Sequence, residues 1–161
     1  MGRIDDRLTE LGLILPPEVK VPAGVVLPFA FVNVRGERAF VSGHGPQAPD
    51  GRLAPPFGQV ESEVTIAEAV EAARLTALSM LGSLQRALGT LDRITGWLRV
   101  FGMVNSTAGF DRQPTVINGF SDLILEMFGP EVGRHARSAV GMASLPFGIP
   151  VEIEAEVSVT P

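Results

Sequence analysis

Three glutamates near the C-terminus alternate with apolar residues. Glu152, Glu154 and Glu156 occupy every second position of the apolar segment 151–159. Because successive side chains of a strand point to opposite faces, this spacing predicts that the three carboxylates share one face. On the pattern alone, a solvated strand face is the simpler interpretation. A glutamate that faces a cleft would instead act as a general base or orient a water molecule.

The segment 133–138 concentrates positive charge just ahead of a predicted strand. It contains Arg134, His135 and Arg137. The planar fork of an arginine suits a small carboxylate because it donates two parallel hydrogen bonds. Taken by itself, surface charge at the edge of a loop is the preferred interpretation, and a role for His135 stays open.

Ser42, His44 and Asn118 are polar residues at the edges of apolar elements. Capping or turn chemistry is the simpler explanation for Ser42 and Asn118. The chain has only two histidines, which excludes a histidine-rich metal site, and no set of carboxylates has the spacing of metal ligands. Phosphate-binding loops, dinucleotide fingerprints and nucleophile elbows are also missing from the sequence.

The elements that must position these residues follow from periodicity. Helical spacing of apolar residues predicts helices over residues 3–11, 65–88 and 115–128, the second with a capping box formed by Thr65 and Glu68. Alternation and turn signals predict strands over residues 29–34, 39–42, 94–104, 138–143 and 151–159. After the first helix this order is β-β-α-β-α-β-β, which predicts an α/β fold of the α+β sandwich kind, with two helices on one face of a mixed sheet.

The length of 161 residues predicts a single domain over residues 1–161, of which residues 1–24 form an N-terminal extension with a short helix.

The composition excludes several classes of partner and site. Thirteen Lys and Arg against 18 Asp and Glu give a net charge of −5, which argues against a nucleic-acid partner. The absence of cysteine excludes disulfides, thiolate catalysis and cysteine-bound metal centres. We expect a cytoplasmic protein with no membrane partner, because neither an export signal nor a membrane-spanning run is recognisable.

Only 19% of the residues are charged, whereas 45% are hydrophobic. An ordinary monomer of this size carries more charge on its surface. We therefore favour burial of some surface between subunits over a mere bias of composition.

Three motifs in a fixed order suggest a known family. The run Arg137–Val140 is followed by Leu145–Pro146 and then by the strand Val151–Ala155. These motifs resemble the C-terminal signature of the RidA family, also called YjgF/YER057c/UK114. Upstream, Phe40–Gly43 resembles the strand of that family that ends in Ser-Gly, and Val116–Asn118 resembles its helix with an asparagine. The resemblance spans residues 25–159.

The resemblance implies a chorismate-mutase-like (RidA-like) fold and a homotrimer with its clefts between subunits. It also implies an imine/enamine deaminase, which hydrolyses reactive 2-imino or 2-enamino acids to 2-keto acids and ammonia without a metal or organic cofactor. Carried over by position, Arg137 would pair with the substrate carboxylate and Glu152 would hold or activate the attacking water. Ser42 and Asn118 would line the cleft, and the backbone near Ala139 would contact the substrate nitrogen.

The sequence departs from the best-known members of the family and resembles a less studied branch. Phe29 stands where they have a tyrosine, His44 where they have a glutamine and Ala139 where they have a cysteine. His44 could supply a polar contact or a proton near neutral pH. The missing hydroxyl at Phe29 motivates an alternative, a trimer that binds small carboxylates or keto acids without turnover. A third function, endoribonuclease, is attached to the family by name, but the net charge of −5 and the few aromatic residues argue against it.

Overall fold

The computed structural model describes residues 2–161 and is built around a sheet of five strands in the order β1-β2-β5-β3-β4. Only the pair β3 and β4 is parallel, so the sheet is mixed. The strands are β1 (Val32–Arg35), β2 (Arg38–His44), β3 (Ile94–Asn105), β4 (Ala136–Met142) and β5 (Val151–Val159). The helices are α1 (Arg3–Glu10), α2 (Ile66–Leu88) and α3 (Gln113–Gly133), with short 3-10 turns at Leu91–Arg93 and Pro146–Gly148.

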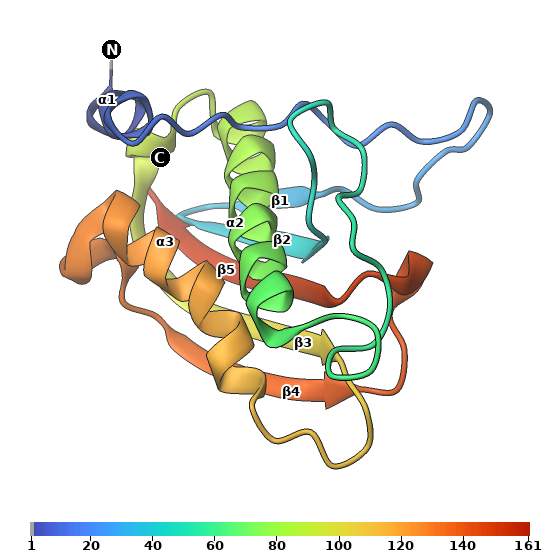
Figure 1. The fold of residues 1–161 in the computed structure, drawn as a ribbon. Helices are drawn as coiled ribbons and strands as arrows, with labels where there is room; N and C mark the ends of the chain where they lie inside the picture. Colours follow the sequence, from blue (N-terminus) through green and yellow to red (C-terminus); the bar gives the residue numbers. More distant parts are fainter. Residues whose placement is uncertain (1) are drawn as a thin grey trace.

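The long helices α2 and α3 lie side by side over one face of the sheet (Figure 1). The side chains between the helices and the sheet form one apolar core, in which Val100, Ile153 and Phe120 are fully buried. The predicted sandwich of a mixed sheet and two covering helices is therefore confirmed.

Helix α2 begins and ends where local chemistry directs it. The Thr65 hydroxyl accepts a hydrogen bond from the Glu68 amide at 3.2 Å, and the Glu68 carboxylate accepts one from the Thr65 amide at 2.8 Å. At the other end Gly89 adopts a φ of 82°, a left-handed conformation that favours glycine. The predicted capping box is confirmed.

Helices α2 and α3 approach closely at Gly119. A Cβ atom added there would overlap the backbone carbonyl oxygen of Val70 on α2. Only glycine therefore fits at this position of α3 without moving one helix away from the other. This close approach fixes the distance between α2 and the first two turns of α3.

Several predicted boundaries differ from the structure, among them the starts of β1 and β4. Residues 29–31 are not part of β1, because the regular pairing of β1 with β2 begins only at Val32, opposite Val41. Strand β4 starts at Ala136 instead of residue 138, because its parallel pairing with β3 extends back to Arg99. The helix predicted to end at residue 128 is interrupted there, at Gly129 with a φ of 73°, and a short helical segment follows within α3.

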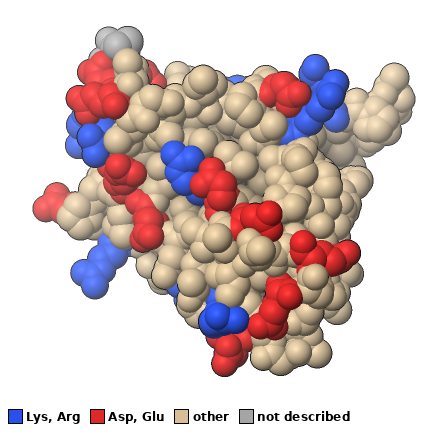
Figure 2. All heavy atoms as spheres, in the orientation of Figure 1, with Lys and Arg blue, Asp and Glu red and all other residues tan. Residues whose placement is uncertain are grey.

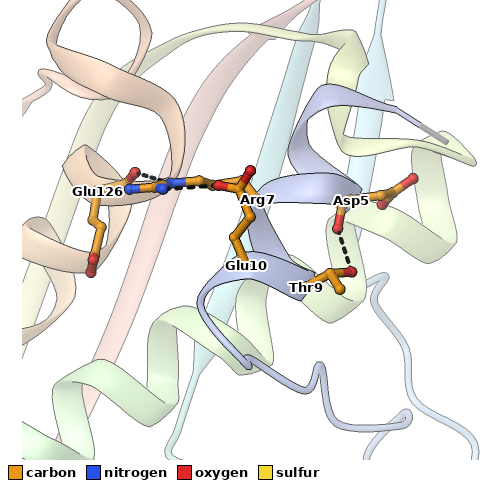
Figure 3. A network of polar contacts seen from close by, with 5 residues as sticks. All are labelled: Asp5, Arg7, Thr9, Glu10 and Glu126. Carbon is orange, nitrogen blue, oxygen red and sulfur yellow. Dashed lines mark hydrogen bonds and ion pairs between the residues drawn. The ribbon is translucent and has the colours of Figure 1, made fainter.

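Helix α1 packs on α3 at one end of the molecule. Ile4 and Leu8 are buried in the core. The Arg7 side chain donates a hydrogen bond to the backbone oxygen of Glu126 at 3.2 Å and forms an ion pair with Glu10 at 3.1 Å (Figure 3). The Thr9 hydroxyl donates to the backbone oxygen of Asp5. The hydrogen bond from Arg7 to Glu126 attaches the N-terminal segment to α3 at the end opposite Asn118, whereas the other two contacts lie within α1.

The other face of the sheet, which we call the open face, is not covered by any helix within residues 2–161. Its side chains mix apolar and charged groups, and Phe40 is 43% exposed there. A shallow cavity of about 170 Å³ on this face is lined in part by Phe40, Phe101 and Glu154. Large apolar side chains that are exposed on such an uncovered face are typical of an interface between subunits.

The helix side of the molecule carries its charges in scattered positions (Figure 2). Lys and Arg form small separate groups there, mostly beside Asp or Glu, and not one basic patch. None of the helices within residues 2–161 is long and apolar enough to cross a membrane.

Candidate functional site

Arg137 lies on β4, at the edge of the sheet, beside the first turns of α3. It pairs in register with Val100, which is fully buried beneath the helices, so both side chains point to the helix side. Its Nη1 donates hydrogen bonds to Asn118 Oδ1 at 2.9 Å and to Ser121 Oγ at 3.1 Å. Its Nη2 donates to the backbone oxygen of Pro114 at 3.4 Å. The structure thus brings together the predicted residues Arg137 and Asn118.

Helical geometry explains why α3 meets Arg137 at these residues. Pro114, Asn118 and Ser121 are spaced i, i+4 and i+7, and so lie on one face of α3. The parallel connection from β3 through α3 to β4 then places that face over the edge strand. We call Arg137, Asn118 and Ser121 the arginine cluster.

His135 adjoins the arginine cluster. Its Nε2 lies 2.9 Å from Ser121 Oγ and its Nδ1 lies 2.8 Å from the backbone oxygen of Gly133. Burial lowers the pKa of His135, and the nearby Arg137 charge lowers it further, against the raising effect of the Gly133 hydrogen bond. The imidazole is therefore neutral at pH 7. Sequence reasoning did not single out Ser121, although its spacing of three residues from Asn118 was visible.

Glu152 lies on the open face. Its neighbours Val151 and Ile153 are fully buried on the helix side, so the carboxylate points the other way. The carboxylate occupies the space that a side chain at Gly43 would need. Burial raises the pKa of Glu152, and the like charge of Glu154 on the same face raises it further. Such a carboxyl accepts a proton more readily than an ordinary surface glutamate.

Ser42 lies in β2 next to Gly43, the residue against which the Glu152 carboxylate packs, and Phe29 precedes β1. Ser42 precedes Gly43, and its hydroxyl donates a hydrogen bond to the backbone oxygen of Ala30 at 2.7 Å. Phe29 is 52% exposed and packs edge-on against Phe31, with the ring centres 5.6 Å apart. Phe29 and Ser42 line an open cavity of about 500 Å³. We call Glu152, Ser42 and Phe29 the glutamate cluster.

The two clusters do not meet within one chain. Arg137 is in register with Val100, whereas Glu152 is in register with Met103. These two β3 residues are an odd number of positions apart, so their side chains point to opposite faces of the sheet. Arg137 therefore faces the helix side and Glu152 faces the open side. A site that uses both groups needs a second copy of the chain.

His44 is buried against α2 and does not lie on the open face. Its exposed fraction is 5%, its Nδ1 lies 2.6 Å from the backbone oxygen of Ser42, and its Nε2 lies 2.8 Å from Ser83 Oγ. Burial lowers the pKa of His44 most, and Arg86 lowers it further, although the hydrogen bond to Ser42 opposes this. The structure thus places the imidazole behind Ser42, where it supports the backbone and does not face the cavity beside Phe29.

Ala139 lies two positions after Arg137 on β4 and therefore on the same face. It pairs with Gly102, whose missing side chain leaves room for Ile117 of α3. The methyl group of Ala139 offers no polar contact, so any hydrogen bond at this position comes from the backbone. Within residues 2–161, no group of three histidine, aspartate or glutamate side chains is arranged to hold a metal ion.

Comparison with known proteins identifies the family. The family model described as "YjgF/chorismate_mutase-like, putative endoribonuclease" matches residues 5–150. Protein TCP17 of Trypanosoma cruzi is 41% identical over 158 residues, which are 97% of this chain and 94% of that protein. The chain belongs to the YjgF/RidA family.

Two crystal structures share the whole YjgF/RidA architecture with this chain. Protein Atu1372 from Agrobacterium tumefaciens is 39% identical and superposes with a TM-score of 0.86, covering 98% of this chain and 94% of the other. A protein from Shewanella oneidensis MR-1 described as a putative endoribonuclease is 30% identical, with a TM-score of 0.84 and coverage of 97% and 99%. Escherichia coli TdcF, solved with bound serine, is 19% identical with a TM-score of 0.59 over 91% of this chain and 94% of the other, and shares the fold. The resemblance inferred from the sequence motifs is confirmed.

Proposed function

We propose that the chain is an imine/enamine deaminase that hydrolyses small 2-imino acids, and their 2-enamino tautomers, to 2-keto acids and ammonia. The observation that carries the proposal is the arginine cluster. Three contacts from α3 hold the guanidinium of Arg137 in place while the side chain stays partly exposed. A guanidinium held in this way is suited to bind a carboxylate through two parallel hydrogen bonds.

Glu152 supplies the second group that the reaction needs. Water adds through its oxygen to the imine carbon, and a carboxylate beside that water accepts one of its protons. That proton passes to the nitrogen and gives a carbinolamine. The carboxylate then moves the hydroxyl proton to the nitrogen as well, the carbon–nitrogen bond breaks with formation of the carbonyl, and the products are ammonia and a keto acid. The imine carbon is already electrophilic, so fixing the carboxylate and placing one water are the main tasks of the protein. The raised pKa of Glu152 supports this role.

The separation of the clusters implies that the site is shared between subunits. We propose that the arginine cluster of one copy faces the glutamate cluster of a neighbouring copy, in the homotrimer that the family resemblance implies. The uncovered open face, with Phe40 and Phe101 among its side chains, supports such an assembly. Ser42, Asn118 and the backbone near Ala139 would then line a cleft between the two copies.

A second candidate function is binding of small carboxylates without turnover. The specific observation in its favour is Phe29, which places an apolar ring beside Ser42 where the best-known members have a hydroxyl. Endoribonuclease activity, which the family description mentions, has less support. The net charge of −5 disfavours binding to a phosphate backbone, and the basic groups on the helix side are scattered and form no continuous positive track there.

We propose the cytoplasm as the place of the reaction, in keeping with the cysteine-free composition.

The direct test of the proposed function is hydrolysis of 2-iminopropanoate, generated in the assay by an amino-acid oxidase. Rates are compared without protein, with the wild type and with Arg137→Ala, and Arg134→Ala is the matched control because Arg134 is exposed three positions away. Acceleration that is lost only in Arg137→Ala supports a deaminase. Pyruvate binding without acceleration supports the binding function instead.

A further inference from the structure

Behind Arg137, two side chains form a hydrogen-bonded chain that the proposed reaction does not use. Ser121 Oγ accepts a hydrogen bond from Arg137 Nη1 and lies 2.9 Å from His135 Nε2. His135 Nδ1 faces the backbone oxygen of Gly133, which can only accept, so Nδ1 carries the proton. In the neutral imidazole Nε2 is then an acceptor, and the Ser121 hydroxyl donates to it. The hydrogen bond of His135 to Gly133 thus determines the direction of the hydrogen bond between Ser121 and His135, and leaves the Ser121 oxygen to accept from Arg137.

The same contacts determine which edge of the guanidinium is free. A guanidinium has five N–H groups: two on Nη1, two on Nη2 and one on Nε. Both groups on Nη1 are used by Asn118 and Ser121, and one on Nη2 is used by Pro114. Among residues 2–161, the N–H on Nε and the second N–H on Nη2 make no hydrogen bond that would compete with a ligand. Nε and Nη2 lie on the same edge of the guanidinium, and this edge is the fork that fits a carboxylate.

We propose that Ser121 and His135 are positioning residues, which hold Arg137 so that this fork, and not another edge, faces the carboxylate ligand. The inference rests on the proposed function of Arg137 as the anchor. Ser121 is only 8% exposed and both of its hydrogen bonds point to other side chains, so it acts through Arg137 and not on the ligand. His135 acts on Ser121, whose hydroxyl it holds, and so reaches Arg137 only through Ser121.

The packing of His135 allows this role to be separated from a structural one. Its ring lies edge-on to the ring of Phe120, with the centres 6.3 Å apart. His135→Phe keeps an aromatic ring at that position and removes both nitrogen atoms. His135→Gln restores a hydrogen-bond acceptor for Ser121. Ser121→Ala removes the hydroxyl with little change of volume.

The experiment measures two quantities for the wild type, these three variants, the double variant Ser121→Ala/His135→Phe and the control Arg134→Ala. The first is the Kd for pyruvate, the product of 2-iminopropanoate hydrolysis, by titration calorimetry. The second is the pair kcat and KM for 2-iminopropanoate. We expect Kd and KM to rise about fivefold in Ser121→Ala and in His135→Phe, the value of one neutral hydrogen bond, with kcat within about twofold of the wild type. His135→Gln recovers part of the loss, and the control changes neither quantity.

Because the two residues act in series, we expect the double variant to lose no more affinity for pyruvate than the single variant that binds pyruvate less tightly. NMR tests the restraint directly. If Ser121 and His135 hold the guanidinium, Nη1 and Nη2 of Arg137 give separate signals in the wild type and merged signals in His135→Phe. Unchanged Kd and KM in both single variants would overturn the positioning role. Pyruvate binding by the wild type without turnover would overturn only the proposed reaction, and the binding series would still decide the role of Ser121 and His135. No binding of pyruvate by the wild type would overturn both.

Discussion

Replacing Arg137 by lysine keeps the positive charge and removes the planar fork. Lysine has a single ammonium group, which cannot donate two parallel hydrogen bonds to a carboxylate. It also cannot keep the contacts of Nη1 to both Asn118 and Ser121, at 2.9 and 3.1 Å, while reaching a ligand. The substitution therefore removes one charge-assisted hydrogen bond to the substrate and the restraint on the anchor.

The magnitude follows from the value of that bond. A hydrogen bond to a charged group contributes about 1.5–3 kcal/mol, which corresponds to a loss of about 10- to 150-fold in kcat/KM. Arg137→Ala removes both bonds to the substrate and loses more. Because Arg137 is partly exposed, we expect the free energy of unfolding to change by less than about 1 kcal/mol in either variant.

The assay follows 2-iminopropanoate hydrolysis over a range of substrate concentrations, so that KM and kcat are separated. We expect KM to carry most of the loss in Arg137→Lys, since the anchor acts on a carboxylate that is present in both the ground state and the transition state. Denaturant unfolding of the same samples measures stability. A kcat/KM for Arg137→Lys within about twofold of the wild type would refute the assignment of the fork to the substrate carboxylate.

Three further predictions concern other parts of the account. Burial and the Glu154 charge raise the pKa of Glu152, so its base form and the activity are lost as the pH falls through that raised pKa. In pH–rate profiles, Glu154→Gln should shift this loss of activity to lower pH, and Glu152→Gln should abolish activity. Gly119→Ala should lower the free energy of unfolding by about 2 kcal/mol in urea titrations, because overlap with the Val70 carbonyl outweighs the gain of about 1 kcal/mol in helix propensity. Phe101→Asp on the open face should give monomers in light scattering and lose activity with assembly, whereas an active monomer would contradict a shared site.

Much of the fold could be predicted because its signals are local. The start and end of α2 depend on Thr65, Glu68 and Gly89, which are close in sequence to the ends that they determine. Boundaries that depend on distant partners were less accurate. The apolar run at residues 29–31 looks like a strand, but regular pairing with β2 begins only at Val32, and this register is not visible in the run itself.

The candidate site could be predicted in part for the same reason. Arg137 and Asn118 were selected together from motifs and do lie in contact. Their contacts with Ser121 and His135 depend on how α3 packs over β4, which no local pattern records. The opposite facing of Arg137 and Glu152 depends on the register of two strands against β3, and sequence alone does not determine this register.

The central claim is that one copy supplies the arginine cluster and its neighbour supplies Glu152. Complementation tests it most directly. Arg137→Ala and Glu152→Gln, each inactive alone, are unfolded together in equal amounts, refolded and assayed with 2-iminopropanoate. In mixed trimers with clefts between subunits, random assembly gives about a quarter of the clefts both intact groups, so we expect about a quarter of wild-type activity. Activity that stays at the level of the separate inactive variants, in mixtures shown to form mixed trimers, would contradict a shared site.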